Sequence, residues 1–172
     1  MKKIILILLI TLIAFPSCKE KTENSNEDVI ATYYLIRHAE KDRGDKINKD
    51  PHLIQVGRQR AKAWQKHFKD IKFDDVYSTD YNRTKETALP TAKANNLIIQ
   101  LYDPFAIDMK AFMEKTKGKT VLIVGHSNTT PKFVNDLIGE EKYDDIQDFN
   151  NANLYKVVVT KEGVTSELSV VN

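Results

Sequence analysis

The chain has 172 residues, with 26 Lys and Arg against 24 Asp and Glu, so its formal charge is only +2. This length suits one globular domain and is too short for a TIM barrel of about 250 residues. A charged fraction of 29% indicates neither a nucleic-acid-binding nor a disordered chain, and the one cysteine cannot form an internal disulfide or a thiolate metal cluster.

The N-terminus has the pattern of a secretory signal peptide. A short basic start, Met1-Lys2-Lys3, precedes an apolar run from Ile4 to Phe15, which is the order of charged and apolar regions in such leaders. A helix over this run spans about 18 Å, well short of the roughly 30 Å hydrocarbon core, so a transmembrane helix is not expected. We therefore predict a signal peptide over residues 1–17.

Cys18, the cysteine of the chain, follows Ser17 at the end of the apolar run. The segment Phe15-Pro16-Ser17-Cys18 resembles the lipobox of bacterial lipoproteins, in which the cysteine is acylated and becomes the new N-terminus, although Phe15 and Pro16 depart from the ideal pattern. The alternative is an ordinary signal peptide with an incidental cysteine. We predict a lipidated Cys18 followed by a flexible polar tether up to residue 30. The protein would then be lipid-anchored to a bacterial membrane in the cell envelope, on the periplasmic or outer-membrane face.

Residues 31–172 alternate predicted strands and helices. In chain order, the pattern predicts a strand at 31–36, a helix at 53–69, a strand at 74–77, a helix at 81–95, a strand at 97–102, a helix at 104–115, a strand at 120–124 and a helix from 131 to 138. Pro90 should bend or interrupt the second helix. Residues 154–160 and 164–171 predict a hairpin. This order indicates an α/β fold, a three-layer α/β/α sandwich with a mostly parallel sheet.

Basic side chains follow the predicted strands. Arg37 and His38 come directly after the first strand, Arg83 follows the second, and His126 follows the fourth. Because ligands bind beyond the carboxyl ends of strands in open α/β sheets, these side chains should meet in one crevice. A guanidinium group can donate two parallel hydrogen bonds to phosphate oxygens, and an imidazole can attack phosphorus. The sequence therefore predicts a phosphoryl site.

Three segments carry a resemblance to a known family. Arg37-His38-Ala39, Ser78 to Ala88, and Val124-Gly125-His126-Ser127 resemble the histidine phosphatase superfamily, also called phosphoglycerate mutase-like. That family has an Arg-His-Gly motif after the first strand, a Ser-x-x-x-Arg-x-x-x-Thr-Ala segment after the second and a histidine after the fourth. Ala39 replaces the glycine. Each motif is short, but three in the right order are specific. The resemblance covers roughly Tyr33 to Leu137.

The resemblance implies a role for each residue. His38 is the expected nucleophile, forming a phosphohistidine that water then hydrolyses, while Arg37, Arg83 and a protonated His126 bind the phosphoryl oxygens. Asp103 is the expected general acid, with Asp108 and Glu40 as alternatives for that role. The backbone N–H of Ser127 is a further candidate donor to the phosphate. Lys41, Asp42 and Arg43 are candidate substrate contacts. No metal or other cofactor is implied.

The predicted function is hydrolysis of phosphomonoesters or phosphoprotein through a phosphohistidine on His38. Expected partners are a phosphorylated small molecule or phosphoprotein and the membrane that holds the lipid anchor, without nucleic acid. The alternative is an envelope lipoprotein that binds phosphate but has lost turnover. Without Lys2 and Lys3 the mature chain has 24 basic and 24 acidic side chains, so a phosphate must be attracted by the local site. His52 and His67 are expected on the solvated surface, and Trp64 and Phe68 in the core.

Overall fold

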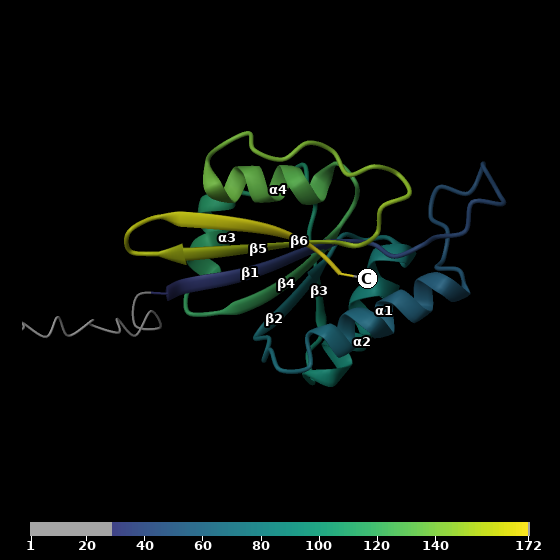
Figure 1. Ribbon diagram of the computed structural model, residues 1–172, viewed down its shortest axis with the longest axis horizontal. Helices are drawn as coiled ribbons and strands as arrows, with labels where there is room; N and C mark the ends of the chain where they lie inside the picture. The colour runs from purple at the N-terminus through teal and green to yellow at the C-terminus, as the bar shows by residue number, and fades with distance from the viewer. Residues whose placement is uncertain (1–28, 172) are drawn as a thin grey trace, which may run out of the picture.

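The computed structural model describes residues 29–171. In it, a six-stranded sheet is covered by helices on both faces (Figure 1). The elements are β1 (Val29–Arg37), α1 (Gln55–His67), β2 (Asp75–Ser78), α2 (Asn82–Ala94), β3 (Ile99–Leu101), α3 (Met109–Lys115), β4 (Thr120–Gly125), α4 (Thr129–Ile138), β5 (Asn153–Thr160) and β6 (Val164–Val170). The predicted signal peptide, Cys18 and the tether up to residue 28 lie outside the described residues. β1 begins two residues before the predicted domain boundary at 31, because Val29 already pairs with Thr160 of β5.

The sheet has the strand order β3-β2-β4-β1-β5-β6. β1 pairs with β4, β4 with β2 and β2 with β3, all in parallel, whereas β5 and β6 form an antiparallel hairpin beside β1. The mostly parallel sheet and the hairpin predicted from the sequence are thus confirmed. Because β1, β2, β3 and β4 point the same way, their carboxyl ends share one edge of the sheet.

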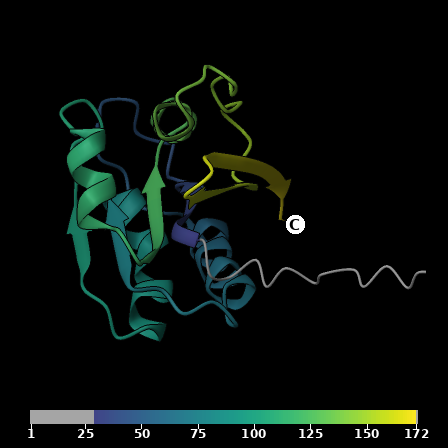
Figure 2. The ribbon, with the colours of Figure 1, turned by 90° about the vertical axis from the view of Figure 1, so that its left-hand side faces the viewer.

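Helices cover both faces of the sheet, so the three predicted layers are present. α1 and α2 lie on one face, where Trp64 and Phe68 pack in a core cluster with Val76 and Leu122 of the sheet. α4 lies on the other face (Figures 1 and 2), and its Phe133 meets Phe112 of α3 edge to face, with ring centroids 5.2 Å apart. Trp64 and Phe68 are 1% and 2% exposed, which confirms their assignment to the core.

Two helices differ from the sequence prediction. α2 continues through Pro90 without interruption, because one face of the helix is buried against the sheet and α1, and this packing outweighs the hydrogen bond that proline cannot donate. The helix expected at 104–115 begins only at Met109. Asp103 Oδ1 accepts a hydrogen bond from the Phe105 backbone N–H at 2.9 Å and forms a turn instead, and Asp108 caps the helix by accepting from Ala111 N at 3.0 Å.

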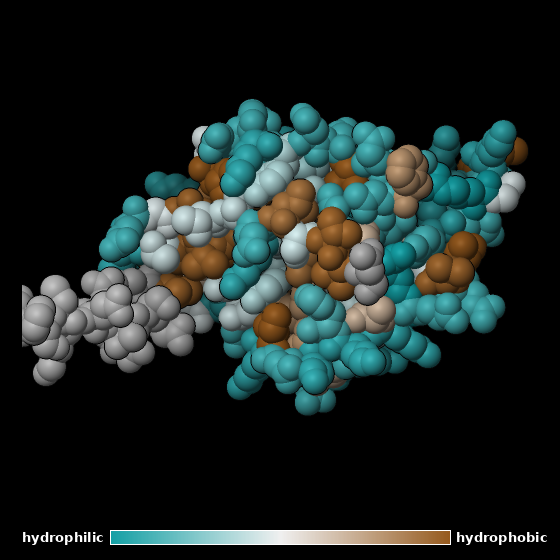
Figure 3. All heavy atoms as spheres, viewed as in Figure 1, coloured by the Kyte–Doolittle hydropathy of each residue, from teal (hydrophilic) through white to brown (hydrophobic). Residues whose placement is uncertain are grey.

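One face of the molecule is mainly polar. The face shown in Figure 3 is largely hydrophilic, with separate hydrophobic groups between the charged side chains. In the part of the chain that the structure describes, none of the helices has the length and apolar character needed to cross a membrane.

Candidate active site

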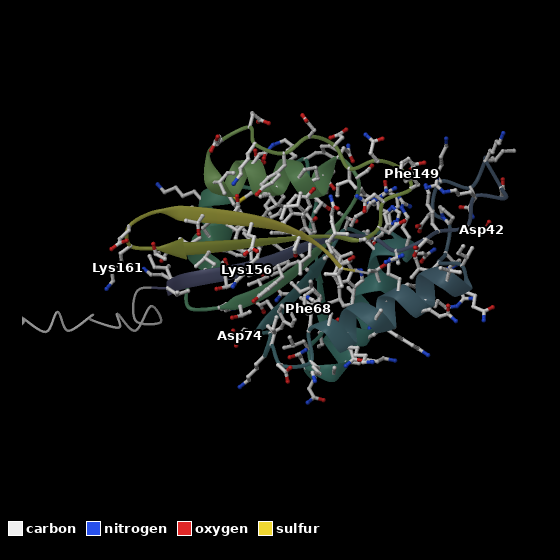
Figure 4. The ribbon with its side chains drawn as sticks, viewed as in Figure 1. Asp42, Phe68, Asp74, Phe149, Lys156 and Lys161 are labelled. Carbon is white, nitrogen blue, oxygen red and sulfur yellow. The ribbon has the colours of Figure 1, made fainter. Side chains whose placement is uncertain are left out.

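A cleft of about 660 Å³ opens at the carboxyl ends of the parallel strands. Arg37 and His38 reach it from the end of β1, Arg83 from α2 just after β2, Asp103 from the loop after β3 and His126 from the loop after β4. The structure therefore brings together the predicted nucleophile, the three predicted phosphate-binding residues and the predicted general acid, whereas Asp42 and Arg43 do not line this cleft. Asp42 and Phe149, next to two residues of the cleft lining, lie at this end of the molecule in Figure 4, and Lys161 lies at the opposite end.

His38 is held as a neutral imidazole of one tautomer. The ring is 3% exposed, and its Nδ1 lies 2.7 Å from the carbonyl oxygen of Ala39. A carbonyl oxygen only accepts hydrogen bonds, so Nδ1 carries the proton and Nε2 keeps its lone pair. Burial, with the charge of Arg37 and smaller contributions from His126 and Arg83, lowers the pKa of His38 to about 3. At neutral pH the free nitrogen is therefore available as a nucleophile.

Arg37 is anchored by a loop that follows the predicted helices. Its Nη1 donates to three backbone carbonyl oxygens, and its Nη2 donates to the Asp148 carboxylate at 2.9 Å; the carbonyls belong to Gln147, Asp148 and Asn150, at 2.8–2.9 Å. The guanidinium Nε is buried and has no partner among the described residues. Hydrogen bonds from Arg43 and Arg37 hold the pKa of Asp148 well below its usual range. Arg37 therefore lies in the predicted site with most of its donors already engaged and Nε unengaged.

Arg83 lies beside His126 and has weaker partners. Its Nη1 is 3.4 Å from the carbonyl oxygen of Lys49 and 3.7 Å from the carboxylate of Asp50, while its guanidinium carbon sits 4.2 Å above the ring of Tyr81. Its Nε is buried without a partner in the described part of the chain. These long contacts leave the guanidinium free to engage a phosphate, as the sequence predicts.

The prediction of a protonated His126 concerns the phosphate-bound site, and in the free protein the ring is neutral. Burial, then Arg83, Lys41 and Arg37, lower the pKa of His126 to about 4, although Asp50 opposes them. The imidazole is therefore neutral at pH 7, because it is buried and shares the cleft with three basic groups, so that a further positive charge there is unfavourable. The histidine itself could be predicted from its position after a strand, but its charge could not.

Thr79 and Tyr102 are among the cleft residues that were not assigned a role from the sequence. Thr79 lines the cleft, and its Oγ1 lies 2.9 Å from Nε2 of His126. In the Ser-x-x-x-Arg pattern, counting back from Arg83 places Thr79, and not Ser78, at the serine position; Ser78 Oγ instead donates to the Thr79 carbonyl oxygen, at 2.8 Å. Tyr102 also lines the cleft with a buried hydroxyl that has no partner among residues 29–171.

The three candidate acids lie in different places. Asp103 lines the cleft, whereas Asp108 caps α3 and Glu40 pairs with Arg60, with Oε1 2.7 Å from Nε. Of the three, the structure thus brings only Asp103 into the cleft. Asp80 and Asp148 also line it, each paired with a basic side chain.

The other sequence assignments are placed as follows. Ser127 lines the cleft at the start of α4, and Lys41 lines it from the loop after β1, where burial and then Arg83 and Arg43 lower its pKa. His67 is exposed, as predicted. His52 is exposed too but pairs with Glu86 of α2, which ties the loop after β1 to that helix.

Within residues 29–171 no cluster of three or more His, Cys, Asp or Glu side chains is placed to hold a metal ion.

Because His38 is buried as a neutral ring, we expect the free energy of unfolding to decrease as the pH is lowered from 7 to 5. The folded-state pKa of about 3 lies below the unfolded value of about 6.5, so below pH 6.5 the unfolded chain binds the proton more readily. At pH 5 this lowers the free energy of unfolding by about 2 kcal/mol, and His126 acts in the same direction. Urea unfolding at pH 5, 6 and 7 measures the decline.

His38→Gln should show a shallower decline than the unmodified chain, because the buried titrating group is gone. His67→Gln removes an exposed histidine and should leave the decline unchanged. An equal decline in the unmodified chain and His38→Gln would show that His38 is not kept neutral by the fold.

The family model of the histidine phosphatase superfamily (branch 1) matches residues 33–106, a span that includes Arg37, His38, Arg83 and Asp103 but not His126. No curated protein matches the chain.

Solved structures share the fold at low sequence identity. A protein histidine phosphatase SixA complexed with tungstate is 14% identical with a TM-score of 0.63, over 81% of this chain and 96% of that one. Phosphoglycerate mutase from Bacillus anthracis is 17% identical with a TM-score of 0.63, over 84% and 95%. A phosphoserine phosphatase mutant from Entamoeba histolytica, in complex with phosphoserine, is 15% identical with a TM-score of 0.61, over 80% and 95%. The solved structures therefore establish the phosphoglycerate mutase-like fold, and residues 33–106 match the histidine phosphatase superfamily.

Proposed function

We propose that the protein is a phosphatase that hydrolyses phosphomonoesters or phosphoprotein through a phosphohistidine on His38. The observation that carries this proposal is the state of His38: a neutral ring at the cleft, with its proton held on Nδ1 by the Ala39 carbonyl oxygen. Such a ring offers the Nε2 lone pair to phosphorus at neutral pH, without first losing a proton.

The surrounding groups suit the charge that develops during phosphoryl transfer. The Nε2–phosphorus bond forms as the bond between phosphorus and the leaving oxygen breaks, and Asp103 in its protonated form gives that oxygen its proton. Water then attacks phosphorus and gives a proton to Asp103, the Nε2–phosphorus bond breaks with its electron pair returning to Nε2, and inorganic phosphate leaves. Arg37 and Arg83 both line the cleft, and only long contacts hold the Arg83 guanidinium, so both place a positive charge beside the non-bridging oxygens.

The shape of the site favours a substrate larger than inorganic phosphate. A second groove of about 630 Å³ continues from the cleft and shares Phe105, Asn128 and Thr129 with it. Phe105 is 79% exposed between the two, where it can contact the leaving group. We propose a phosphate carried by a larger organic molecule or by an exposed segment of a protein.

The alternative function, phosphate binding without turnover, predicts a cleft that lacks an acid. Asp103 lines the same cleft as His38, although the loop turn engages one of its oxygens. A carboxyl group in that position supports the enzyme over the binding protein.

We further propose that the protein acts in the cell envelope, held by a lipid on Cys18 after removal of residues 1–17. The described chain enters the sheet at Val29, and the cleft lies at the other end of the nine-residue strand β1. At about 3.3 Å per residue the strand separates the two by roughly 26 Å. An anchor before Val29 would therefore leave the cleft open to large substrates. Mass spectrometry of the mature N-terminus tests the lipid on Cys18, and an unmodified Cys18 would refute it.

A trapping experiment tests the phosphohistidine. The full chain in detergent is mixed with a radiolabelled aryl phosphate and quenched in alkali within one turnover. We expect phosphate release, together with a protein-bound label that is stable in alkali, lost in acid and located on the peptide that contains His38. Turnover with the label on another residue would overturn the mechanism, whereas vanadate binding without turnover would favour the binding protein.

A further inference from the structure

A short chain of buried hydroxyl groups lies behind His126. Thr79 Oγ1 is 2.9 Å from His126 Nε2 and 3.0 Å from Thr84 Oγ1. The Thr84 hydroxyl in turn lies 2.9 Å from two carbonyl oxygens, those of Thr79 and Tyr81. Thr79 and Thr84 are 1% and 0% exposed, so these groups have to satisfy their hydrogen bonds with one another.

The directions of these hydrogen bonds follow from the acceptors at the end of the chain. Carbonyl oxygens cannot donate, so the Thr84 hydroxyl donates to them, and its oxygen accepts the proton of Thr79. The oxygen of Thr79 has no proton left for His126 and must accept one from it. Nε2 of His126 therefore carries a hydrogen, and the lone pair is on Nδ1.

The other ring nitrogen faces the candidate phosphate site. Nδ1 of His126 lies 3.4 Å from Nη2 of Arg83, and the ring centroid lies 5.6 Å from that of His38. A long contact from a guanidinium is compatible with a lone pair on Nδ1 and not with a second proton there. Both neighbours of the imidazole thus require the same tautomer.

We propose that Thr79 is a positioning residue for His126, which keeps the proton on Nε2 so that the nitrogen that titrates, Nδ1, faces the phosphoryl group. The inference rests on the proposed function. When a phosphoryl group engages Arg83, Nδ1 can take one proton from solvent and donate it as a hydrogen bond to a non-bridging oxygen. No bond to phosphorus forms or breaks in this step, and the Nε2 hydrogen bond to Thr79 is kept throughout.

The charges around His126 make this proton uptake depend on the bound anion. Basic groups on three sides disfavour the imidazolium in the free protein, where the pKa is about 4. A phosphate dianion bound among them would reverse that effect and raise the pKa. The titratable and charged groups that face the ring are Arg83 of α2, Lys41 and Asp50 of the loop after β1, Arg37 and His38 at the end of β1, and Tyr81, whose ring meets His126 edge to face with centroids 5.0 Å apart.

Nitrogen-detected NMR of the full chain in detergent reads the tautomer directly, with sulfate as the probe because it does not titrate between pH 5 and 8. We expect the Nε2–H tautomer of His126 without sulfate, and a second proton on Nδ1 with sulfate bound at pH 6. Thr79→Val removes the acceptor at nearly constant volume and should shift the ring to the Nδ1–H tautomer or a mixture. Thr79→Ser retains the hydroxyl and should keep the Nε2–H form.

Kinetics with an aryl phosphate give the second readout. In Thr79→Val we expect kcat to fall about 10- to 100-fold with a smaller change in KM, and Thr79→Ser to recover most of the loss, as is typical of residues that orient another side chain. Thr91→Val is the matched control, because Thr91 is equally buried and its hydroxyl has no partner in the described chain. It should change neither the tautomer nor kcat.

The outcomes separate this inference from the proposed function. An Nδ1–H tautomer in the unmodified chain overturns the inference whatever the variants do, and so does an unchanged tautomer and kcat in Thr79→Val. If the unmodified chain shows the expected tautomer and sulfate response but hydrolyses no phosphate ester, the inference holds and the proposed function fails. Should Thr79→Val not fold, the unmodified chain and Thr79→Ser still decide the tautomer.

Discussion

His38→Gln should lower kcat/KM for an aryl phosphate by at least about 10³-fold, because glutamine has no basic nitrogen to attack phosphorus. The buried amide can still donate to the Ala39 carbonyl oxygen, so the fold of the cleft should be retained. A phosphate monoester resists hydrolysis by water alone, and the arginines can position it but cannot form the covalent intermediate. Initial rates of phosphate release at pH 6–7 measure the effect.

The control is His67→Gln, the same change at an exposed position on α1 far along the helix from the cleft. It should leave kcat/KM within about twofold of the unmodified chain. Vanadate affinity provides a check on folding, since the arginines remain in His38→Gln. Activity in His38→Gln equal to that in His67→Gln would rule out His38 as the nucleophile.

The positions of the site residues were predictable because they follow from local sequence and one topological rule. Arg37 ends β1, His38 and His126 each come directly after a strand, and parallel strands bring their carboxyl ends to one edge. The anchoring of Arg37 was not predictable. Its partners are backbone carbonyl oxygens some 110 residues away, and carbonyl groups leave no mark in a sequence.

The protonation of His126 shows a second kind of limit. It depends on burial and on the summed charge of Arg83, Lys41 and Arg37, which come from three different parts of the chain. A sequence names such charges but does not give their distances, and electrostatic energy depends on distance and burial. The neutral state of His126 in the free protein could therefore not be read from the sequence.

The two helices that differ from their prediction also show where local sequence and tertiary packing compete. Pro90 predicts a break from local geometry alone, but α2 is held on the sheet by a buried face that extends past the proline. Around Asp103 the local sequence decides instead, because the turn that Asp103 forms delays the start of the helix predicted from residue 104. Tertiary packing decided the first case and turn chemistry the second.

Gly57→Ala should lower the free energy of unfolding by about 3 kcal/mol, more than the gain in helix propensity of up to about 1 kcal/mol. Gly57 lies in the first turn of α1, and a Cβ there would be 2.1 Å from the carbonyl oxygen of Glu40. That oxygen belongs to the backbone and accepts a hydrogen bond from Ile54 N at 3.0 Å, so it cannot rotate away. Urea unfolding at pH 7 gives the change.

Relief of the clash must move either α1 or the backbone two residues beyond His38. We therefore expect Gly57→Ala to lower kcat as well as stability, whereas Gly44→Ala, where the nearest atom is an Asp42 side-chain oxygen at 3.2 Å, should change the free energy of unfolding by less than about 0.5 kcal/mol. If Gly57→Ala were as stable as the unmodified chain, the close approach of α1 to the strand that carries His38 would not exist in solution. If it were less stable but fully active, the segment after His38 would tolerate the shift, and the nucleophile would be held by β1 and the Ala39 carbonyl alone.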